Sequence, residues 1–274
     1  MFDKTIENVR SSAPLVHCIT NYVTVNDVAN VLLACGASPI MADDVNEAAE
    51  ITSICGGLTI NIGTLNERTI TSMLSAGKKA NELGNITVLD PAGAGASKLR
   101  TKTTFHLLEE LNFSVIRGNI SEIKAVYAGS GATQGVDANV SDAVTEDNLD
   151  EVIEFAKELS KKTKAVIAIT GAIDIVADDK KSYIIRNGHP IMSKITGSGC
   201  MLTSIITAYC VANSDCILDA TATAVICEGI AGEKAYERTQ AMNGGTSTFR
   251  MCFIDAMSQM TDEMISEGMK VEIR

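Results

Sequence analysis

Tryptophan is absent from this chain of 274 residues, and proline is scarce, with only 4 residues. No proline-rich linker, low-complexity tract or internal repeat divides the sequence. Hydrophobic residues make up 46% and charged residues 21%, which is typical of a globular protein with a large core. We therefore expect one domain over residues 1–274, a length that a single large α/β sheet with its helices can occupy.

Positively charged residues are also few. The chain has 23 Lys and Arg against 34 Asp and Glu, which gives a formal net charge of −11. A nucleic-acid groove needs a concentrated basic surface that displaces phosphate counterions, so we expect no nucleic-acid partner. A small anionic ligand is still compatible, because a few backbone amides and one arginine bind phosphate whatever the net charge.

Long hydrophobic runs, a signal peptide and C-x-x-C pairs are lacking as well. Most of the 8 cysteines lie in apolar runs, where a free thiol packs as a small core residue. Only 3 histidines are present, so we expect His17 to be partly buried and hydrogen-bonded rather than part of a metal cluster. These features predict a protein of the reducing cytoplasm that does not bind a membrane.

What the sequence does contain is a regular alternation of short apolar runs with longer amphipathic stretches. This order predicts an α/β fold with a mostly parallel central sheet and helices on both faces. Residues 173–191 carry two apolar runs around a charged turn, which predicts an antiparallel hairpin at the sheet edge. The other expected strands are residues 15–19, 38–41, 58–62, 86–90, 114–117 and 165–170, and 174–177 begins the hairpin.

Two kinds of helix are expected. Between residues 149 and 159, apolar residues recur on one helical face, which predicts a helix that covers the sheet. Residues 201–211 and 217–230 are apolar on nearly all sides. Helices of that composition belong inside a domain or at a subunit contact.

Polar or glycine-rich segments follow three of the expected strands. They are Asp90 to Gly95, Arg117 to Glu122, and Thr170-Gly171. Ligands in open α/β sheets bind at the carboxyl ends of the strands, so these segments are candidates for a binding site.

A further segment, Thr196-Gly197-Ser198-Gly199-Cys200, directly precedes an apolar helix. Small residues let several backbone N–H groups converge, and the helix adds the positive end of its dipole. The segment therefore predicts an anion hole that stabilises charge on a transferred phosphoryl group. Neither G-x-x-x-x-G-K-[ST] nor G-x-G-x-x-G occurs in the chain, so a P-loop or Rossmann assignment has no support.

These residues resemble the ribokinase-like superfamily, in which a glycine-rich anion hole, usually G-A-G-D, opens a late helix. Here Cys200 stands in place of that aspartate, the usual base. The T-G-x-G-C form resembles the hydroxyethylthiazole kinase family instead. Other segments similar to that family are residues 16–21, 36–42, 89–91, 117–122 and 169–171, so the resemblance extends from residue 15 to about 255.

The resemblance implies a ribokinase-like fold and the Mg²⁺-dependent transfer of a phosphoryl group from ATP to 4-methyl-5-(2-hydroxyethyl)thiazole in thiamine salvage. It also implies a homotrimer with active sites at the subunit interfaces. Two alternatives stay open. One is a related enzyme, such as a hydroxymethylpyrimidine kinase or a nucleotide-dependent hydratase-repair enzyme, although the apolar segment Pro39-Ile40-Met41 suits a thiazole better. The other is a non-catalytic thiazole or nucleotide sensor that kept the fold.

By the same resemblance, the residues that contact ATP are Arg117, Thr170 and Asn119. A guanidinium can bridge phosphate oxygens, which agrees with this role for Arg117, whereas Thr170 could instead cap a turn. The resemblance assigns Asn21, Met41 and Gly197 to the thiazole pocket.

The remaining roles concern the reacting groups. Gly197, Gly199 and Cys200 are the expected catalytic residues. The thiol of Cys200 is either a weak base, because a helix N-terminus lowers a thiol pKa, or only a surface that packs against the substrate. Asp90 and Glu122 are candidates for holding Mg²⁺ through water, although a capping box at the start of a helix explains Glu122 equally well.

Overall fold

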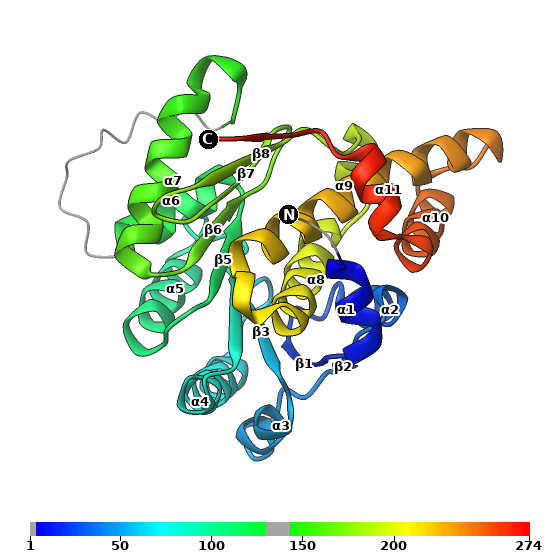
Figure 1. The fold of residues 1–274 in the computed structure, drawn as a ribbon. Coiled ribbons are helices and arrows are strands. Elements are labelled where there is room, and N and C mark those ends of the chain that lie inside the picture. The colour runs from blue at the N-terminus through cyan, green and yellow to red at the C-terminus, as the bar shows by residue number, and fades with distance from the viewer. Residues whose placement is uncertain (1–3, 130–142) are drawn as a thin grey trace.

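The computed structural model describes residues 4–129 and 143–274 (Figure 1). Its strands form one sheet in the order β2-β1-β3-β4-β5-β6-β7-β8-β9. Strands β1 to β6 pair in parallel, and β7, β8 and β9 pair antiparallel, so the expected mostly parallel sheet is confirmed. The strands are β1 (Leu15–Ile19), β2 (Ser38–Ile40), β3 (Gly57–Asn61), β4 (Ile86–Asp90), β5 (Val115–Gly118), β6 (Val166–Ile169), β7 (Asp174–Ala177), β8 (Ser182–Ile185) and β9 (Val271–Ile273).

Helices cover both faces of this sheet, as expected. One face packs against α1, α2 and α8 to α11, and the other against α3 to α7 (Figure 1). The helices are α1 (Thr5–Ser12), α2 (Val25–Cys35), α3 (Ala48–Ile54), α4 (Glu67–Leu83), α5 (Lys98–Glu110), α6 (Ile120–Gly129), α7 (Leu149–Thr163), α8 (Ser198–Ala212), α9 (Ile217–Ala241), α10 (Thr246–Gln259) and α11 (Asp262–Gly268).

The sheet has a hydrophobic core on each side because successive strand residues point to opposite faces. In β4, Val88 joins the core beneath α8 and α9, whereas the next residue, Leu89, joins the core beneath α4 to α7. Strand β5 repeats this division with Val115 and Ile116. These strands read as continuous apolar runs because both of their faces are buried.

The expected difference between the helices is also confirmed. In α7 the apolar face that the periodicity predicts is buried, and it covers the sheet. In α8 every residue from Met201 to Cys210 is buried. Of the described helices, none alone has the length and apolar composition of a membrane span; α8 and α9 meet those criteria only as a pair, with a bend of 111° between them.

The hairpin prediction is partly wrong. Strands β7 and β8 do form an antiparallel pair, but β8 pairs on its other side with β9, which is the edge strand. Strand β9 has only three residues and lies between Lys270 and Arg274, so it carries little apolar signal in the sequence. Its pairing with β8 brings the C-terminal segment back to the sheet.

His17 is hydrogen-bonded as expected, but it is fully rather than partly buried. Its ring nitrogens lie 2.8 Å from Oγ1 of Thr52 and 2.7 Å from the carbonyl oxygen of Ala42. The eight cysteines are free thiols, and most of them are buried.

Candidate active site

The carboxyl ends of β4, β5 and β6 meet around one guanidinium group. Arg117, in β5, donates a hydrogen bond from Nη2 to Oγ1 of Thr170, which directly follows β6, at 2.5 Å. Its Nη1 atom lies 3.7 Å from Oδ2 of Asp90, the last residue of β4. The side chain of Arg117 is only 13% exposed, so its charge is held close to these partners. Three of the sequence-predicted residues therefore lie together.

The glycines before α8 allow close approaches that other residues would block. Gly197 has φ +92°, a left-handed conformation, and a Cβ atom there would come within 2.6 Å of Cγ2 of Thr24. A Cβ atom at Gly199 would overlap the guanidinium of Arg117. The N-terminus of α8, which begins at Ser198, therefore lies against Arg117. Helix amides and a fixed positive charge face the same region, as an anion hole requires.

Cys200 lies in the first turn of α8 and contacts two asparagine side chains. Its Sγ atom accepts from Nδ2 of Asn21 at 3.1 Å and from Nδ2 of Asn61 at 3.4 Å. Oδ1 of Asn61 also accepts from Nδ2 of Asn21, at 3.1 Å. The structure therefore brings together Asn21 and Cys200, which the resemblance assigns to the thiazole pocket and to catalysis, and adds Asn61, which we did not anticipate. Met41 follows β2 and packs, half-buried, against the same hydrophobic core as Cys200.

The pKa of the Cys200 thiol is raised, so the expectation that its helix position lowers it is wrong. The largest cause is burial, and the negative charge of Asp90 adds to it. Hydrogen bonds from Thr24 and Asn21 and the charge of Arg117 act in the opposite direction without cancelling it. A thiol in this environment stays protonated at neutral pH, which favours a positioning role for Cys200 over that of a base.

Asp90 is buried and is the hub of a polar network. Its Oδ2 atom accepts from Nδ2 of Asn61 at 2.7 Å and from Oγ1 of Thr203, in α8, at 2.9 Å. Burial raises its pKa to about 6; the charge of Arg117 opposes the rise and that of Glu122 adds to it. Asn61 therefore links Asp90 to Cys200, and Asp90 is close enough to Glu122 for their charges to interact.

Glu122 forms the capping box that its position allows. Its Oε2 atom accepts from the backbone N–H of Asn119 at 2.8 Å, and Oδ1 of Asn119 accepts from the N–H of Glu122 at 2.9 Å. Its Oε1 atom accepts from the N–H of Gly93, at 2.8 Å, in the loop after β4. Glu122 thus caps α6 and fixes the loop that follows Asp90.

A protein-only metal cage is not present in the described part of the chain, where no group of three His, Cys, Asp or Glu residues is placed to hold an ion. Two neighbouring carboxylates, Asp90 and Glu122, remain. That set of hard oxygen donors fits Mg²⁺ that is bound mainly by nucleotide phosphates and water.

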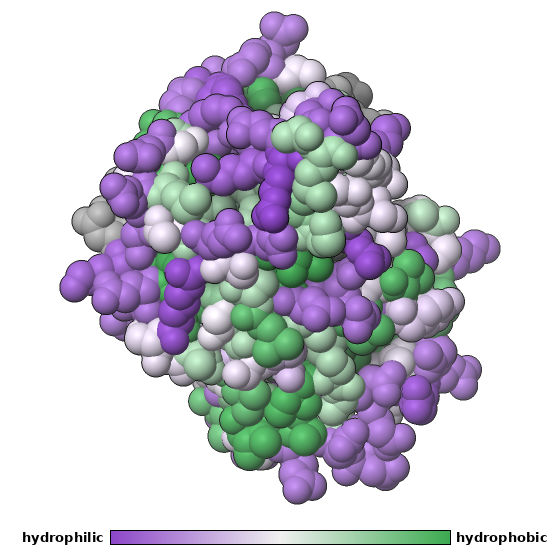
Figure 2. All heavy atoms as spheres, turned by 90° about the vertical axis from the view of Figure 1, so that its right-hand side faces the viewer, coloured by the Kyte–Doolittle hydropathy of each residue, from purple (hydrophilic) through white to green (hydrophobic). Residues whose placement is uncertain are grey.

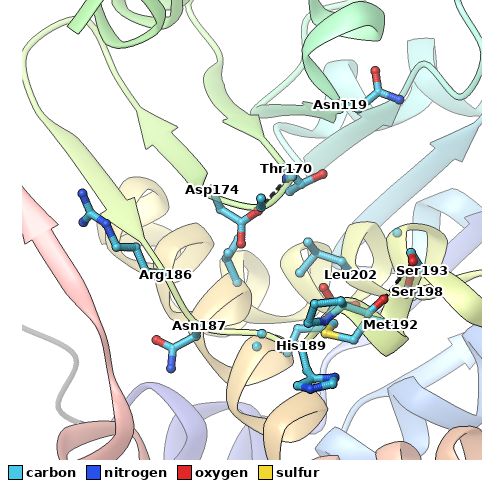
Figure 3. A pocket seen from close by; sticks show the side chains of 18 of the residues that line it. Asn119, Thr170, Asp174, Arg186, Asn187, His189, Met192, Ser193, Ser198 and Leu202 are labelled. Atoms are coloured by element: carbon cyan, nitrogen blue, oxygen red, sulfur yellow. Dashed lines mark hydrogen bonds between the residues drawn. The ribbon is translucent and has the colours of Figure 1, made fainter. Parts of the chain in front are cut away.

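A cavity of about 510 Å³ opens beside Arg117 (Figure 3). All three residues expected to contact ATP, Arg117, Asn119 and Thr170, line it, together with Ser198 and Gly199 of the glycine-rich segment. Its opposite wall comes from the loop of residues 186–193 and from α9. The cavity thus runs from the N-terminus of α8 to a part of the fold for which the sequence suggested no role.

Two acidic residues in this cavity were missed. Asp174, at the start of β7, and Glu228, in α9, both line it. Burial raises the pKa of Asp174 to about 7 and that of Glu228 to about 8. The sequence could have pointed to a functional role for Glu228, because it is the only charged residue between positions 220 and 232 of an otherwise apolar helix.

A family model described as the hydroxyethylthiazole kinase family matches residues 6–263. The chain belongs to this family. It is 58% identical over 272 residues to a hydroxyethylthiazole kinase of Clostridium acetobutylicum, with 99% of each chain covered. It is 51% identical over 267 residues to that of Clostridium beijerinckii, with 97% of this chain and 95% of the relative covered.

Solved structures agree with this assignment. The hydroxyethylthiazole kinase protein of Pyrococcus horikoshii OT3 superposes with a TM-score of 0.87 at 35% identity, over 100% of this chain and 98% of that one. A ribokinase-like superfamily protein of Enterococcus faecalis, with a TM-score of 0.61 and 10% identity over 94% and 89% of the two chains, shares the fold alone. The expected family, ribokinase-like fold and thiazole kinase activity in thiamine salvage are confirmed, and the pyrimidine kinase and sensor alternatives are not supported.

Proposed function

We propose that the γ-phosphoryl group of ATP is transferred to the hydroxyl of 4-methyl-5-(2-hydroxyethyl)thiazole at the N-terminus of α8. The observation that carries this proposal is the close approach of the Arg117 guanidinium to Gly199, in the first turn of α8, where a helix has its free backbone amides. Negative charge on a transferring phosphoryl group needs fixed donors of this kind.

The nucleotide occupies the cavity beside Arg117 in this account. Arg117 presents a permanent positive charge and a planar set of donors to the phosphate oxygens. Thr170 orients Arg117 through their hydrogen bond, and both line the cavity with Asn119. Because these groups are held by strand ends, little reorganisation is needed when charge develops during transfer.

The thiazole alcohol binds on the other side of the anion hole, near Asn21, Met41 and Gly197. A methionine thioether is polarizable and adapts to a flat ring that contains sulfur. Cys200 orients the hydroxyl group rather than removing its proton, because its raised pKa keeps the thiol protonated. A strong base is unnecessary, since the nucleophile loses its proton late when the transition state is loose.

Asp90 and Glu122 are the residues that would hold Mg²⁺ with the nucleotide, through water. When bound, the ion would neutralise charge on the phosphate oxygens. Burial and the charge of Glu122 raise the pKa of Asp90. A cation bound nearby would favour the charged carboxylate and so lower this pKa again, which suits Asp90 to the position.

A homotrimer with shared active sites is part of the proposal. Large apolar side chains are exposed next to Asn21, one of the residues proposed to bind the thiazole. Tyr22 and Val23, which directly follow it, are 77% and 56% exposed. Figure 2 shows hydrophobic side chains gathered at the lower end of one face, at the height of α3 in Figure 1. Burying such surface against a second copy is favourable. We also assign the chain to the cytoplasm, where its free thiols stay reduced.

The activity test compares acceptors. The purified protein is incubated with ATP and Mg²⁺ and either the thiazole alcohol or hydroxymethylpyrimidine, and phosphorylated products are measured by mass spectrometry. We expect a phosphorylated thiazole and little phosphorylated pyrimidine, and no product after removal of divalent ions with EDTA. Equal or faster turnover of the pyrimidine would overturn the substrate, and undiminished turnover in EDTA would overturn the role of Mg²⁺.

The assembly test uses light scattering on Val23→Asp, with Leu83→Asp as the control, because Leu83 is 48% exposed at the end of α4. We expect a trimeric wild type, a trimeric control and a dissociated Val23 variant. A wild type that is monomeric while fully active would contradict shared active sites.

A further inference from the structure

Two acidic side chains from different elements face the cavity that Arg117 lines. Asp174 starts β7, and Glu228 reaches the cavity from α9. Figure 3 shows Asp174 beside Thr170, with Asn187, His189 and Met192 on the opposite wall. Ionised carboxylates repel phosphates, so two acidic side chains next to a phosphate-binding arginine favour a ligand group that itself donates hydrogen bonds.

The two acids lie close to Arg117. Arg117 bonds to Thr170, and the backbone N–H of the next residue, Gly171, donates to Oδ1 of Asp174 at 2.8 Å. Asp174 is therefore linked to the guanidinium through two hydrogen bonds, which are joined by Thr170 and its peptide bond to Gly171. The charges of Arg117 and Asp174 both act on the pKa of Glu228, so Glu228 belongs to the same cluster.

Glu228 carries an oxygen that the described protein leaves without a partner. Its side chain is buried, with the residue 6% exposed, and Oε1 has no hydrogen bond among the described residues. Nε of Arg117, which lines the same cavity, is also buried without a partner among the described residues, whereas Nδ2 of Asn187 donates to the carbonyl oxygen of Gly268 at 2.9 Å. A buried polar atom without a partner costs about 1–3 kcal/mol, so such atoms are rare unless a ligand or water completes them.

The chemistry of a bound nucleotide identifies the missing partner. With its phosphates at Arg117, the first O–H donors along the molecule are the ribose hydroxyls, whereas the base lies farther away. Two adjacent hydroxyls match a pair of carboxyl groups, and acidic side chains bind ribose hydroxyls in other nucleotide sites.

We propose that Asp174 and Glu228 bind the ribose hydroxyl groups of the nucleotide. This inference rests on the proposed position of the nucleotide in the cavity. The raised pKa values, about 7 for Asp174 and about 8 for Glu228, mean that the pair holds a proton near neutral pH. A protonated carboxyl donates one hydrogen bond and accepts another, which lets the pair exchange hydrogen bonds with a hydroxyl as donor and acceptor.

The test begins with the wild type and measures binding, so that catalysis is not needed. Isothermal calorimetry gives Kd for ADP, 2′-deoxy-ADP and 3′-deoxy-ADP. We expect removal of at least one hydroxyl to weaken binding by about five- to tenfold, the effect of one hydrogen bond. Equal Kd values for all three nucleotides overturn the ribose assignment but leave the nucleotide site intact. Failure of ADP itself to bind overturns the nucleotide site and the inference together.

Variants then assign the effect to a residue. Glu228→Ala should weaken ADP binding by about five- to tenfold and bring the ratio between ADP and the sensitive deoxynucleotide close to one. Glu228→Gln should keep most of the discrimination, because an amide also donates and accepts. Glu237→Ala, on an exposed position of α9, is the matched control and should behave as wild type.

The competing outcome is that Glu228 contacts the nucleotide base instead of the ribose. If Glu228→Ala loses its preference for ADP over GDP and keeps the preference for the ribose hydroxyl, Glu228 contacts the base and the proposal is wrong. Full retention of ribose discrimination in Glu228→Ala overturns it as well.

Discussion

The guanidinium of Arg117 occupies the space that a side chain at Gly199 would need. This contact joins the end of β5 to the first turn of α8, two elements that are about 80 residues apart in the sequence. It explains why a helical position, where alanine is ordinarily better than glycine, carries no side chain. The same contact defines the point at which the account places the transferred phosphoryl group.

Gly199→Ala therefore tests the anion hole by adding a methyl group without changing any charge or hydrogen-bonding group. The added methyl group should displace Arg117 and lower kcat by at least about tenfold, while the fold survives because the residue is helical. Gly245→Ala is the control, since a Cβ atom at Gly245 would meet nothing within 4 Å. Steady-state kinetics and thermal unfolding of both variants check this. Normal kcat in Gly199→Ala would show that the contact is dispensable.

Arg117→Lys keeps the charge and removes the planar donor set. We expect kcat to fall by about a hundredfold and KM for ATP to rise, because an ammonium group cannot bond to Thr170 and bridge phosphate oxygens in the same way. Arg68→Lys, an exposed arginine paired with Asp43, should change neither constant. An Arg117→Lys enzyme with unaltered kinetics would remove Arg117 from the mechanism.

Cys200→Asp and Cys200→Ala separate positioning from proton removal. Amide groups of Asn21 and Asn61 already point at Sγ, so they can donate to a carboxylate at the same place. We expect Cys200→Asp to retain or increase kcat and Cys200→Ala to reduce it modestly, as turnover measurements on both variants will show. Complete inactivity of a folded Cys200→Asp would contradict the proposed position of the acceptor hydroxyl.

Glu228 should make the stability of the protein depend on pH. Burial raises its pKa from 4.5 to about 8, so the folded chain keeps a proton that the unfolded chain loses as the pH rises through that range. The free energy of unfolding therefore falls with rising pH between these values, and the loss is complete above about pH 8.

Glu228→Gln removes this dependence. Its advantage over wild type should grow to the order of a few kcal/mol by pH 8 and vanish near pH 4, as measured by urea unfolding. Glu237→Gln, which is exposed, should show no such trend. A constant difference between Glu228→Gln and wild type across this range would mean that Glu228 titrates normally.

Local patterns predicted most of the fold. Strand β4 was expected at its observed bounds because its apolar run is flanked by polar residues, and the buried face of α7 was visible as a helical period. Strand β9 could not be predicted, because its three residues form a strand only through pairing with β8.

The site was predictable where its residues lie in recognisable segments. Arg117, Thr170 and Asn119 were expected together, and they line one cavity. Asn61 could not be found, since its contacts with Asp90 and Cys200 join residues 29 and 139 positions apart. The pKa of Cys200 was predicted in the wrong direction because burial, which the sequence does not report, is the largest influence on it and outweighs the hydrogen bonds and the charge of Arg117 that lower it.

The central claim is that the first turn of α8 and Arg117 together hold the transferred phosphoryl group. A crystal structure with the thiazole alcohol and a non-hydrolysable ATP analogue tests it most directly. The account predicts the γ-phosphate between the guanidinium of Arg117 and the backbone amides of Gly197 to Cys200, with the thiazole hydroxyl beside Sγ of Cys200. A γ-phosphate bound elsewhere, with protein atoms filling that space, would contradict it.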